Sequence, residues 1–347
     1  MTPPVIALPL FALLLSGCGL TDSGAAERDA RGRDAGEQDP APAEEPPPDA
    51  PAEPDPTAGL PTGCEEPLAC YRNPSRTGAF DAELVPEASG LAASVRNPGV
   101  LYLLDDRPGT GGVWLISGTG EHLGTVQVAG LDARNTEDLA VGPCGPGDAN
   151  TCVYIGDIGD NLARLPGIFI HRFVEPDLSA GPPQGEVGAD MITLTYPDQP
   201  SDAETLLVDD DGIPYVVTKA SYDAEQRVTG PTRLYRAPGW AEGTMEYLGD
   251  VPVPEARLGL AASAVGNVIT GGDSLDGRVI LRTYDHVLEY VAPTPEAPLG
   301  DFPTWPVHAA PTPLLPQAEA IAYALDDCGY YTASEQVGDL YFIACRD

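Results

Sequence analysis

The hydrophobic residues of this chain occur in short runs that are separated by turn-forming residues. Between Glu137 and Glu204 one run alternates strictly, with Ile192, Leu194 and Tyr196 spaced by threonines. An apolar residue at every second position is the pattern of a β-strand with one buried face. The interval contains four strand-like runs, at 139–141, 153–155, 168–173 and 192–196. The pattern therefore predicts a group of four antiparallel strands.

This arrangement recurs along the chain. An acidic residue opens an apolar run at five places, which are Glu87, Glu137, Glu204, Asp273 and Glu319. Four of them are followed by a turn and a second run that begins with tyrosine. Units of 46 to 69 residues with four strands each are typical of β-propeller blades. We predict an all-β propeller of five four-stranded blades, or of six if the stretch from Arg233 to Asp273 contains another.

Two segments test this prediction. We expect the short run Glu83–Val85 to supply the outer strand of the last blade and so to close the ring. Residues 317–325 are rich in alanine and glutamate and, taken alone, favour a helix. Because they align with the strand that Glu204 opens, we predict a strand there.

Composition supports a fold of strands and turns. The 347 residues include 39 glycines and 38 prolines, which excludes a mostly helical protein. Acidic residues number 53 against 18 basic ones, so the net charge is -35, and Lys219 is the sole lysine. Such a surface repels phosphate backbones and argues against binding to nucleic acid. Metal cations, basic partners and neutral ligands remain compatible with it.

The first residues predict an extracytoplasmic location. An eleven-residue apolar run, Val5–Leu15, is too short to span a bilayer but suits a secretory signal. It ends in Leu15-Ser16-Gly17-Cys18, which resembles the lipobox of bacterial lipoproteins. The resemblance implies a signal peptide over 1–18 and a lipid-bearing Cys18 that anchors the protein at the cell envelope, periplasmic or surface-exposed. An ordinary cleaved signal is the alternative, since residues 1–4 lack the usual basic side chains.

Residues 19–62 differ from the rest of the chain. They hold eleven acidic residues and nine prolines with almost no large apolar side chains. A segment of this kind cannot bury enough apolar surface to offset the entropy of ordering. We predict a disordered, extended tether over 19–62 and a propeller domain over 63–347.

Six cysteines remain after Cys18. Cys328 and Cys345 flank two strand-like runs symmetrically, and Cys144 and Cys152 flank a loop rich in glycine and proline. Opposite residues of a hairpin lie at a separation that a disulfide accepts. We therefore predict the disulfides Cys144–Cys152 and Cys328–Cys345, which leaves Cys64 to pair with Cys70. A zinc site is the alternative, but the usual ligand spacing is missing.

The predicted fold brings the acidic residues together. In a blade, the start of the first strand and the end of the second lie on the same face, so the repeat acids meet at one axial mouth. A ring of carboxylates needs either protons or a cation, and hard oxygen ligands favour calcium. The loop Gly156–Asn161 adds further oxygens, although it also fits a turn whose side chains cap their own backbone. The candidate calcium ligands are Glu87, Glu137, Asp138, Asp157, Asp160, Asn161, Asp202, Glu204, Asp273 and Glu319.

From about residue 81 to 347 the chain resembles uncharacterised extracytoplasmic bacterial β-propellers, broadly similar to the phytase-like and TolB-like propellers. The resemblance rests on the loop Gly156–Asn161, on Asp202-Ala203-Glu204, on 270–273 with 282–284, and on 319–321. It implies a propeller with an axial site and no particular reaction. Calcium phytases also need basic residues around the substrate, and few are available here.

Catalytic motifs are scarce. The sequence has no Gly-X-Ser-X-Gly elbow, its four histidines are isolated, and Gly109–Gly112 precedes a strand and not a helix, which predicts a turn. Trp114, Trp240 and Trp305 are expected to pack between blades. We expect a monomer that binds an unknown protein or small-molecule ligand at a calcium-loaded mouth. The alternative is a metal-dependent hydrolase of an ester, lactone or phosphodiester at the same mouth, so the sequence leaves open whether the protein is an enzyme.

Overall fold

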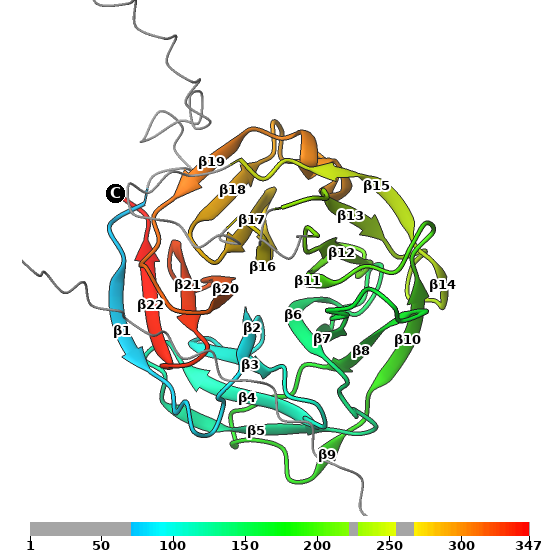
Figure 1. The fold of residues 1–347 in the computed structure, drawn as a ribbon. Helices are drawn as coiled ribbons and strands as arrows, with labels where there is room; N and C mark the ends of the chain where they lie inside the picture. Colours follow the sequence, from blue (N-terminus) through cyan, green and yellow to red (C-terminus); the bar gives the residue numbers. More distant parts are fainter. Residues whose placement is uncertain (1–70, 222–227, 255–266, 347) are drawn as a thin grey trace, which may run out of the picture. The chain divides into compact units, whose positions relative to one another are not determined.

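The computed structural model describes residues 71–221, 228–254 and 267–346. In these residues five β-sheets stand around a central axis, with β2, β6, β11, β16 and β20 innermost (Figure 1). The chain is therefore a five-bladed β-propeller, as the repeat predicts. No helix within the described ranges is both long and apolar enough to cross a bilayer.

The blades follow one another along the chain, and every pairing within their first four strands is antiparallel. The first blade contains β2 (Ala88–Ala93), β3 (Val100–Asp105), β4 (Gly112–Ser117), β5 (His122–Val128) and the short β9 (Glu186–Val187). The second contains β6 (Thr136–Pro143), β7 (Thr151–Asp157), β8 (Ile168–Val174), β10 (Asp190–Thr195) and the short β14 (Gly243–Thr244). The third contains β11 (Ala203–Val208), β12 (Pro214–Thr218), β13 (Thr232–Arg236) and β15 (Glu246–Val251).

The last two blades complete the ring. The fourth contains β16 (Ile269–Leu275), β17 (Arg278–Thr283), β18 (Val287–Val291) and β19 (Val307–Ala310), with the 3-10 helix η1 (Leu299–Thr304) before β19. The fifth contains β20 (Ala318–Tyr323), β21 (Gly329–Ser334), β22 (Asp339–Ala344) and β1 (Ser75–Ala79). The predicted strand at 317–325 is thus confirmed. The described part of the stretch from Arg233 to Asp273 forms no sixth blade and instead supplies strands of the second, third and fourth.

The ring closes by a strand from the start of the domain, but not by the predicted one. The outer strand of the fifth blade is β1, in which Ser75 pairs with Phe342 of β22. The predicted segment Glu83–Val85 forms a turn, because the backbone N–H groups of Leu84 and Val85 both donate to the carbonyl of Asp81. The apolar Val85 is buried beneath this turn, which explains its hydrophobic character without a strand.

Packing between successive blades holds the ring together. Each of the five hydrophobic clusters joins two neighbouring blades. The inner strands β11 and β20 are buried along almost their whole length. The inner strands of neighbouring blades lie close together, which explains why they contain small residues. A side chain at Gly271 of β16 would come within 2.3 Å of the carbonyl oxygen of Glu319.

Two disulfides staple hairpins, as predicted. Cys144 and Cys152 have Cα atoms 5.0 Å apart, and Cys328 and Cys345 have Cα atoms 5.3 Å apart. The second bond ties β21 to the end of β22 in the blade where the ring closes. Cys64 and Cys70, like residues 1–62 with Cys18, lie outside the described residues.

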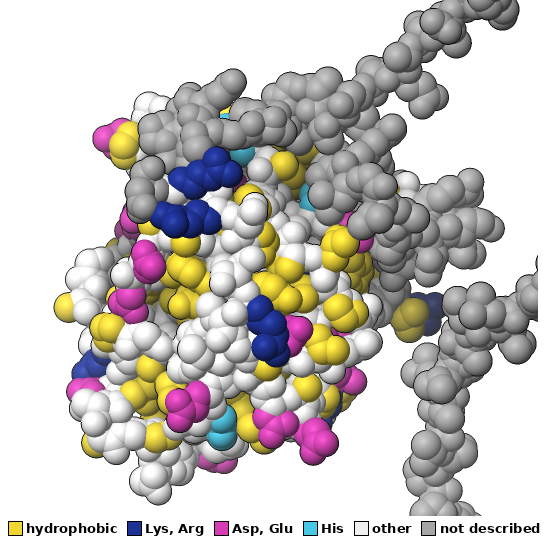
Figure 2. Space-filling model, turned by 90° about the vertical axis from the view of Figure 1, so that its left-hand side faces the viewer, with side chains coloured by type: hydrophobic (Ala, Val, Ile, Leu, Met, Phe, Trp, Pro, Cys, Tyr) yellow, Lys and Arg dark blue, Asp and Glu magenta, His cyan; other side chains and the backbone are white. Residues whose placement is uncertain are grey.

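One side of the propeller has a surface of mixed character. Figure 2 shows the side on which β1 and β22 lie, where hydrophobic, basic and acidic side chains are intermixed. Arg76 on β1 and Asp339 on β22 form an exposed ion pair of 2.6 Å on this blade.

Candidate functional site: the acidic mouth

A backbone irregularity at the start of every inner strand builds the mouth. Each inner strand has a β-bulge one or two residues after its first residue, where its register with the second strand shifts. A bulge re-aims a side chain and is common beside functional sites. The residues at the bulges, in blade order, are Ser89, Glu137, Glu204, Thr270 and Glu319.

The bulges correct the repeat that the sequence predicts. Glu137, Glu204 and Glu319 occupy equivalent positions, but Glu87 lies just before β2 and Asp273 lies deeper along β16. In those two blades the bulge position belongs to a hydroxyl residue. Ser89 donates to the carbonyl oxygen of Glu137, and Thr270 donates to that of Ala318, at 2.5 and 2.8 Å.

Two more sets of residues share the rim. The residues that follow the second strands are Asp106, Ile158, Lys219, Tyr284 and Glu335, and those that precede the inner strands include Glu87, Asn135, Asp202 and Gln317. Seven carboxyl side chains therefore surround one lysine at the mouth: Glu87, Asp106, Glu137, Asp202, Glu204, Glu319 and Glu335. They come from four of the five blades.

Three of these carboxylates form a cluster that can hold a metal ion. One oxygen from each of Glu137, Asp202 and Glu204 lies within 4.8 Å of the other two. The side-chain amide N–H of Asn135 donates to Glu137, and the backbone N–H of Asp160 donates to Asp202 at 2.7 Å. These donors fix the orientation of two carboxylates, as the groups around metal ligands commonly do.

Lys219 ties this cluster to the rest of the ring. Its ammonium lies 2.6 Å from Glu204 Oε1 and 3.5 Å from the hydroxyl of Tyr284, and both ion-pair partners are almost fully buried. The same hydroxyl lies 3.4 Å from Glu319 Oε1. Burial lowers the pKa of Lys219, but Glu204, Tyr284 and Asp202 outweigh it and raise that pKa above its ordinary value. The ammonium is therefore fixed in its charged form.

The pKa values of the carboxyl groups at the mouth are raised above their ordinary range. Burial raises the pKa of Glu204 to about 7, against the opposing effect of Lys219. Burial, and then the charges of Glu204 and its neighbours, raise the pKa of Glu137 and of Glu319 well above their usual range. The pKa of Asp106 rises to about 8, because it is buried and shares a hydrogen bond with Glu87. At neutral pH several of these carboxyls therefore hold protons in the metal-free protein, and a bound cation would stabilise their ionised forms instead.

The loop Gly156–Asn161 takes a different place from the cluster. The carboxylate of Asp157 accepts the backbone N–H of Asn135 at 3.0 Å and pairs with Arg134 at 3.1 Å. The carboxylate of Asp160 accepts the backbone N–H of Leu165 at 2.6 Å. Asn161 is exposed. In this structure the loop positions Asn135 and Asp202. The backbone-capping alternative accounts for the contacts of Asp160, whereas Asp157 binds the distant Arg134 and Asn135.

Asp138 and Asp273 lie on the inner strands below the mouth. Asp138 of β6 accepts the backbone N–H of Leu206 in β11 at 2.9 Å, and Asp273 of β16 accepts that of Tyr323 in β20 at 2.8 Å. Each carboxylate therefore joins the inner strands of two blades. Burial raises the pKa of Asp273 to about 7 and raises that of Asp138 well above its usual value.

Asn135 and Tyr284 were missed as site residues by the sequence interpretation. Both stand beside strand ends, so the spacing of the repeat marks their positions, but neither carries the acidic side chain that was sought. A cavity of about 310 Å³ opens next to the cluster, and Asp202 and Lys219 stand in its wall with Arg233. A small ligand could therefore reach a metal ion at the cluster from the side of the third blade.

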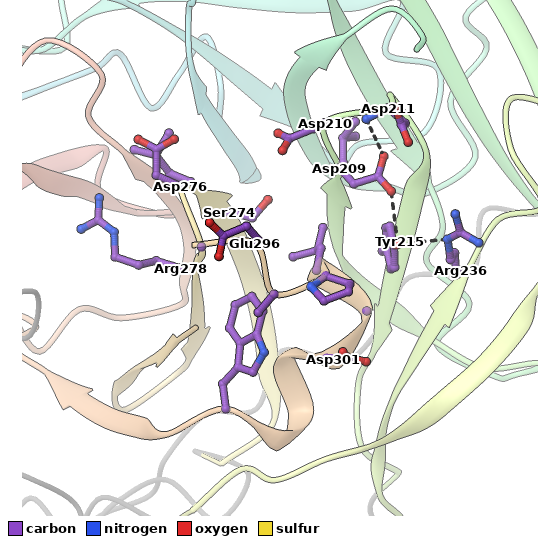
Figure 3. A pocket seen from close by; sticks show the side chains of 18 of the residues that line it. Asp209, Asp210, Asp211, Tyr215, Arg236, Ser274, Asp276, Arg278, Glu296 and Asp301 are labelled. Atoms are coloured by element: carbon purple, nitrogen blue, oxygen red, sulfur yellow. Dashed lines mark hydrogen bonds between the residues drawn. The ribbon is translucent and has the colours of Figure 1, made fainter. Parts of the chain in front are cut away.

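A larger cavity lies away from the mouth. It has a volume of about 620 Å³ and opens between the third and fourth blades, where β11 and β16 end. Figure 3 shows Asp209, Tyr215 and Arg236 joined by hydrogen bonds on one wall, with Asp276 and Arg278 on the other. Because the inner strands begin at the mouth, this cavity belongs to the opposite face of the ring.

Comparisons with known proteins are distant. No protein-family model matches the chain, and neither does any curated protein. The PQQ-bound aldose sugar dehydrogenase of Streptomyces coelicolor is 11% identical with a TM-score of 0.43, over 80% of this chain and 99% of that chain. A putative gluconolactonase is 13% identical with a TM-score of 0.43, over 80% and 95%. An auxiliary nutrient binding protein from Bacteroides thetaiotaomicron is 11% identical with a TM-score of 0.41, over 83% and 75%.

Proposed function

We propose that the protein is a calcium-dependent binding protein whose acidic mouth holds a ligand or a partner protein. The observation that carries the proposal is the cluster of Glu137, Asp202 and Glu204, three buried or half-buried carboxylates within 4.8 Å of one another. Hard oxygen ligands of this kind, with Asn135 beside them, suit calcium better than zinc. The cavity of about 310 Å³ beside the cluster gives a ligand access to the cation.

The test is direct titration of metal-free protein with calcium by calorimetry, with melting temperature recorded in parallel. We expect one tight site that Glu137→Gln weakens at least tenfold, since a charged ligand is lost while its shape is kept. Glu186→Gln on the exposed β9 is the matched control and should bind calcium like the unchanged protein. Absence of calcium binding, or equal binding by both variants, would contradict the proposal.

A metal-dependent hydrolase at the same mouth is the second candidate. The observation that favours it is the carboxyl group of Glu204, whose pKa is raised by burial to about 7. A group with that pKa can act as a general base near neutral pH. Turnover of chromogenic esters, lactones or phosphodiesters that requires calcium would identify an enzyme, whereas calcium binding without turnover would identify a binder.

We also propose that the propeller is attached to the cell envelope through Cys18 and the tether over 19–62. The support is the apolar run followed by Leu15-Ser16-Gly17-Cys18, and several acyl chains would give a stable anchor. Mass spectrometry of the purified protein should find the N-terminal cysteine acylated, and Cys18→Ser should release the protein from membranes. Recovery of both forms in the soluble fraction would contradict the anchor.

A further inference from the structure

The outer part of the first blade carries a third hollow, which shares no residue with the three-carboxylate cluster. It measures about 320 Å³ and is bounded by β4, β5 and the glycine-rich loop before β4. No carboxylate lines it, whereas both cavities described above have aspartates in their walls. In a chain with 53 acidic residues, a hollow without any points to a ligand that is not a cation. We call it the Trp114 groove, after the aromatic residue in its wall.

One of the three tryptophans, Trp114, lines this groove. Trp305 is buried in the core between the third and fourth blades, and the ring of Trp240 is covered by the guanidinium of Arg172 at 3.8 Å. Both pack as the sequence predicts, and Trp114 likewise packs against the hydrophobic cluster that joins the fifth and first blades. Trp114 is half-buried and lines the groove, and its indole N–H has no hydrogen-bond acceptor within the ranges that the structure describes. An aromatic face and a free donor therefore meet at this surface.

The sheet register places polar side chains next to the ring. Trp114 pairs with Thr125, and Gly112 pairs with Gln127, so Thr125 and Gln127 lie on the same face of the blade as Trp114. The side-chain amide of Gln127 is exposed and makes no hydrogen bond to any described residue. It offers two donors and one acceptor. The groove thus presents uncommitted groups of both kinds beside one aromatic face.

Glycines keep the groove open. A side chain at Gly111 would lie 3.7 Å from the carbonyl oxygen of Leu131 and 3.8 Å from Gln127 Oε1, which is ordinary contact without a clash. A side chain at Gly109 would meet nothing within 4 Å. The loop therefore leaves space that residues with side chains would fill.

The charge of the groove is balanced. Arg107 is its one charged residue, and its Nε lies 2.7 Å from the buried carboxylate of Asp105. An anion would find a guanidinium that is already paired with Asp105, and a cation would find no carboxylate. A ligand with many hydroxyl groups satisfies donors and acceptors alike, and the C–H face of a sugar ring can lie on an indole. We propose that the Trp114 groove binds a neutral saccharide, as a single sugar ring or the end of a longer chain.

The experiment uses the purified full-length protein and three neutral trisaccharides as probes: maltotriose, cellotriose and N,N′,N″-triacetylchitotriose. Binding is measured by calorimetry and by the indole N–H signals of the three tryptophans in NMR spectra. At least one probe should bind, and it should shift the signal that is missing in Trp114→Phe. Because this site is separate from the mouth, removal of calcium should leave saccharide binding unchanged, whatever the outcome for calcium itself.

Three variants locate the site. Gln127→Ala should weaken binding about tenfold through lost hydrogen bonds, and Gly111→Leu should abolish it by filling the hollow without strain. Gln199→Ala, in the wall of the cavity beside the mouth, is the matched control and should bind normally. Failure of all three probes to bind, or binding that Gln127→Ala and Gly111→Leu leave intact, would overturn the proposal. Loss of binding in Gln199→Ala alone would likewise overturn it, by moving the site to the mouth.

Discussion

Without calcium the protein should become less stable as the pH rises from 5 to 8. Burial raises the pKa of Glu204 from 4.5 to about 7, and that of Asp106 from 3.8 to about 8. Between its ordinary value and its raised value each group holds a proton in the folded state that the unfolded chain releases. The folded state therefore binds more protons in this window, and stability falls as the pH increases through it.

The size of the effect follows from the shifts. One pKa unit corresponds to about 1.4 kcal/mol, so Glu204 alone removes about 3 kcal/mol of unfolding free energy between pH 4.5 and 8. Because the carboxyl groups of the mouth interact electrostatically with one another, their contributions to the unfolding free energy do not simply add. For a domain of this size we expect the melting temperature in chelator to drop by about 5 °C or more. Calcium at a hundredfold excess over its dissociation constant should restore about 2.7 kcal/mol at pH 8.

The assay is thermal unfolding from pH 5 to 8 in chelator and in calcium. High salt is the control, because it screens repulsion between surface acids but acts little on buried ones. The pH dependence should therefore persist in high salt and become shallower in Glu137→Gln. Equal or higher stability at pH 8 in chelator would refute the reasoning, since it would show that the mouth tolerates full ionisation.

Three further predictions follow from named contacts. Lys219→Met removes the one ammonium of the mouth, so the unfolding free energy in chelator at pH 8 should fall by about 3 kcal/mol. Calorimetry should show that this variant binds calcium at least tenfold more tightly. Unchanged affinity would mean that Lys219 does not compete with the metal. Asp138→Ala leaves two backbone N–H groups buried without an acceptor and should cost about 1–3 kcal/mol in denaturant unfolding, with calcium affinity preserved. Replacing Cys328 and Cys345 together by serine should lower the unfolding free energy by about 2–4 kcal/mol, and reductant should have the same effect on the unchanged protein.

The sequence predicts the fold well because the strands of the propeller follow from patterns of neighbouring residues. Alternating apolar residues define the strands, and the recurring acid marks the start of three inner strands correctly at Glu137, Glu204 and Glu319. The two disulfides within the described residues follow from hairpin symmetry, which also is local. Closure by β1 was missed because Ser75–Ala79 carries little hydrophobic signal: as an outer strand it is mostly exposed.

The site is less predictable, because bulges decide which side chains reach the mouth. A bulge depends on the register with the second strand and leaves no mark in one strand alone. Glu87 and Asp273 were therefore aligned with the wrong positions, which belong to Ser89 and Thr270. Both hydroxyls donate a hydrogen bond to the backbone of the next inner strand. At the position where the other three blades have a carboxyl group, these two blades therefore have a hydrogen bond that joins neighbouring strands.

The difference between these two groups of blades explains why the charged side chains are distributed unevenly around the mouth. At the bulge position the second, third and fifth blades carry a carboxyl group, and the third blade also places Lys219 beside its own. Through Tyr284 the ammonium links Glu204 to Glu319, so a proton, a metal ion and Lys219 all compete for the same negative charge. A metal ion at Glu137, Asp202 and Glu204 weakens the hold of the carboxylates on Lys219 and lowers the affinity of Glu319 for its proton. Calcium binding at one side of the ring should therefore release protons from the other side, which makes the whole mouth, and not the three-carboxylate cluster alone, the unit that responds to a ligand.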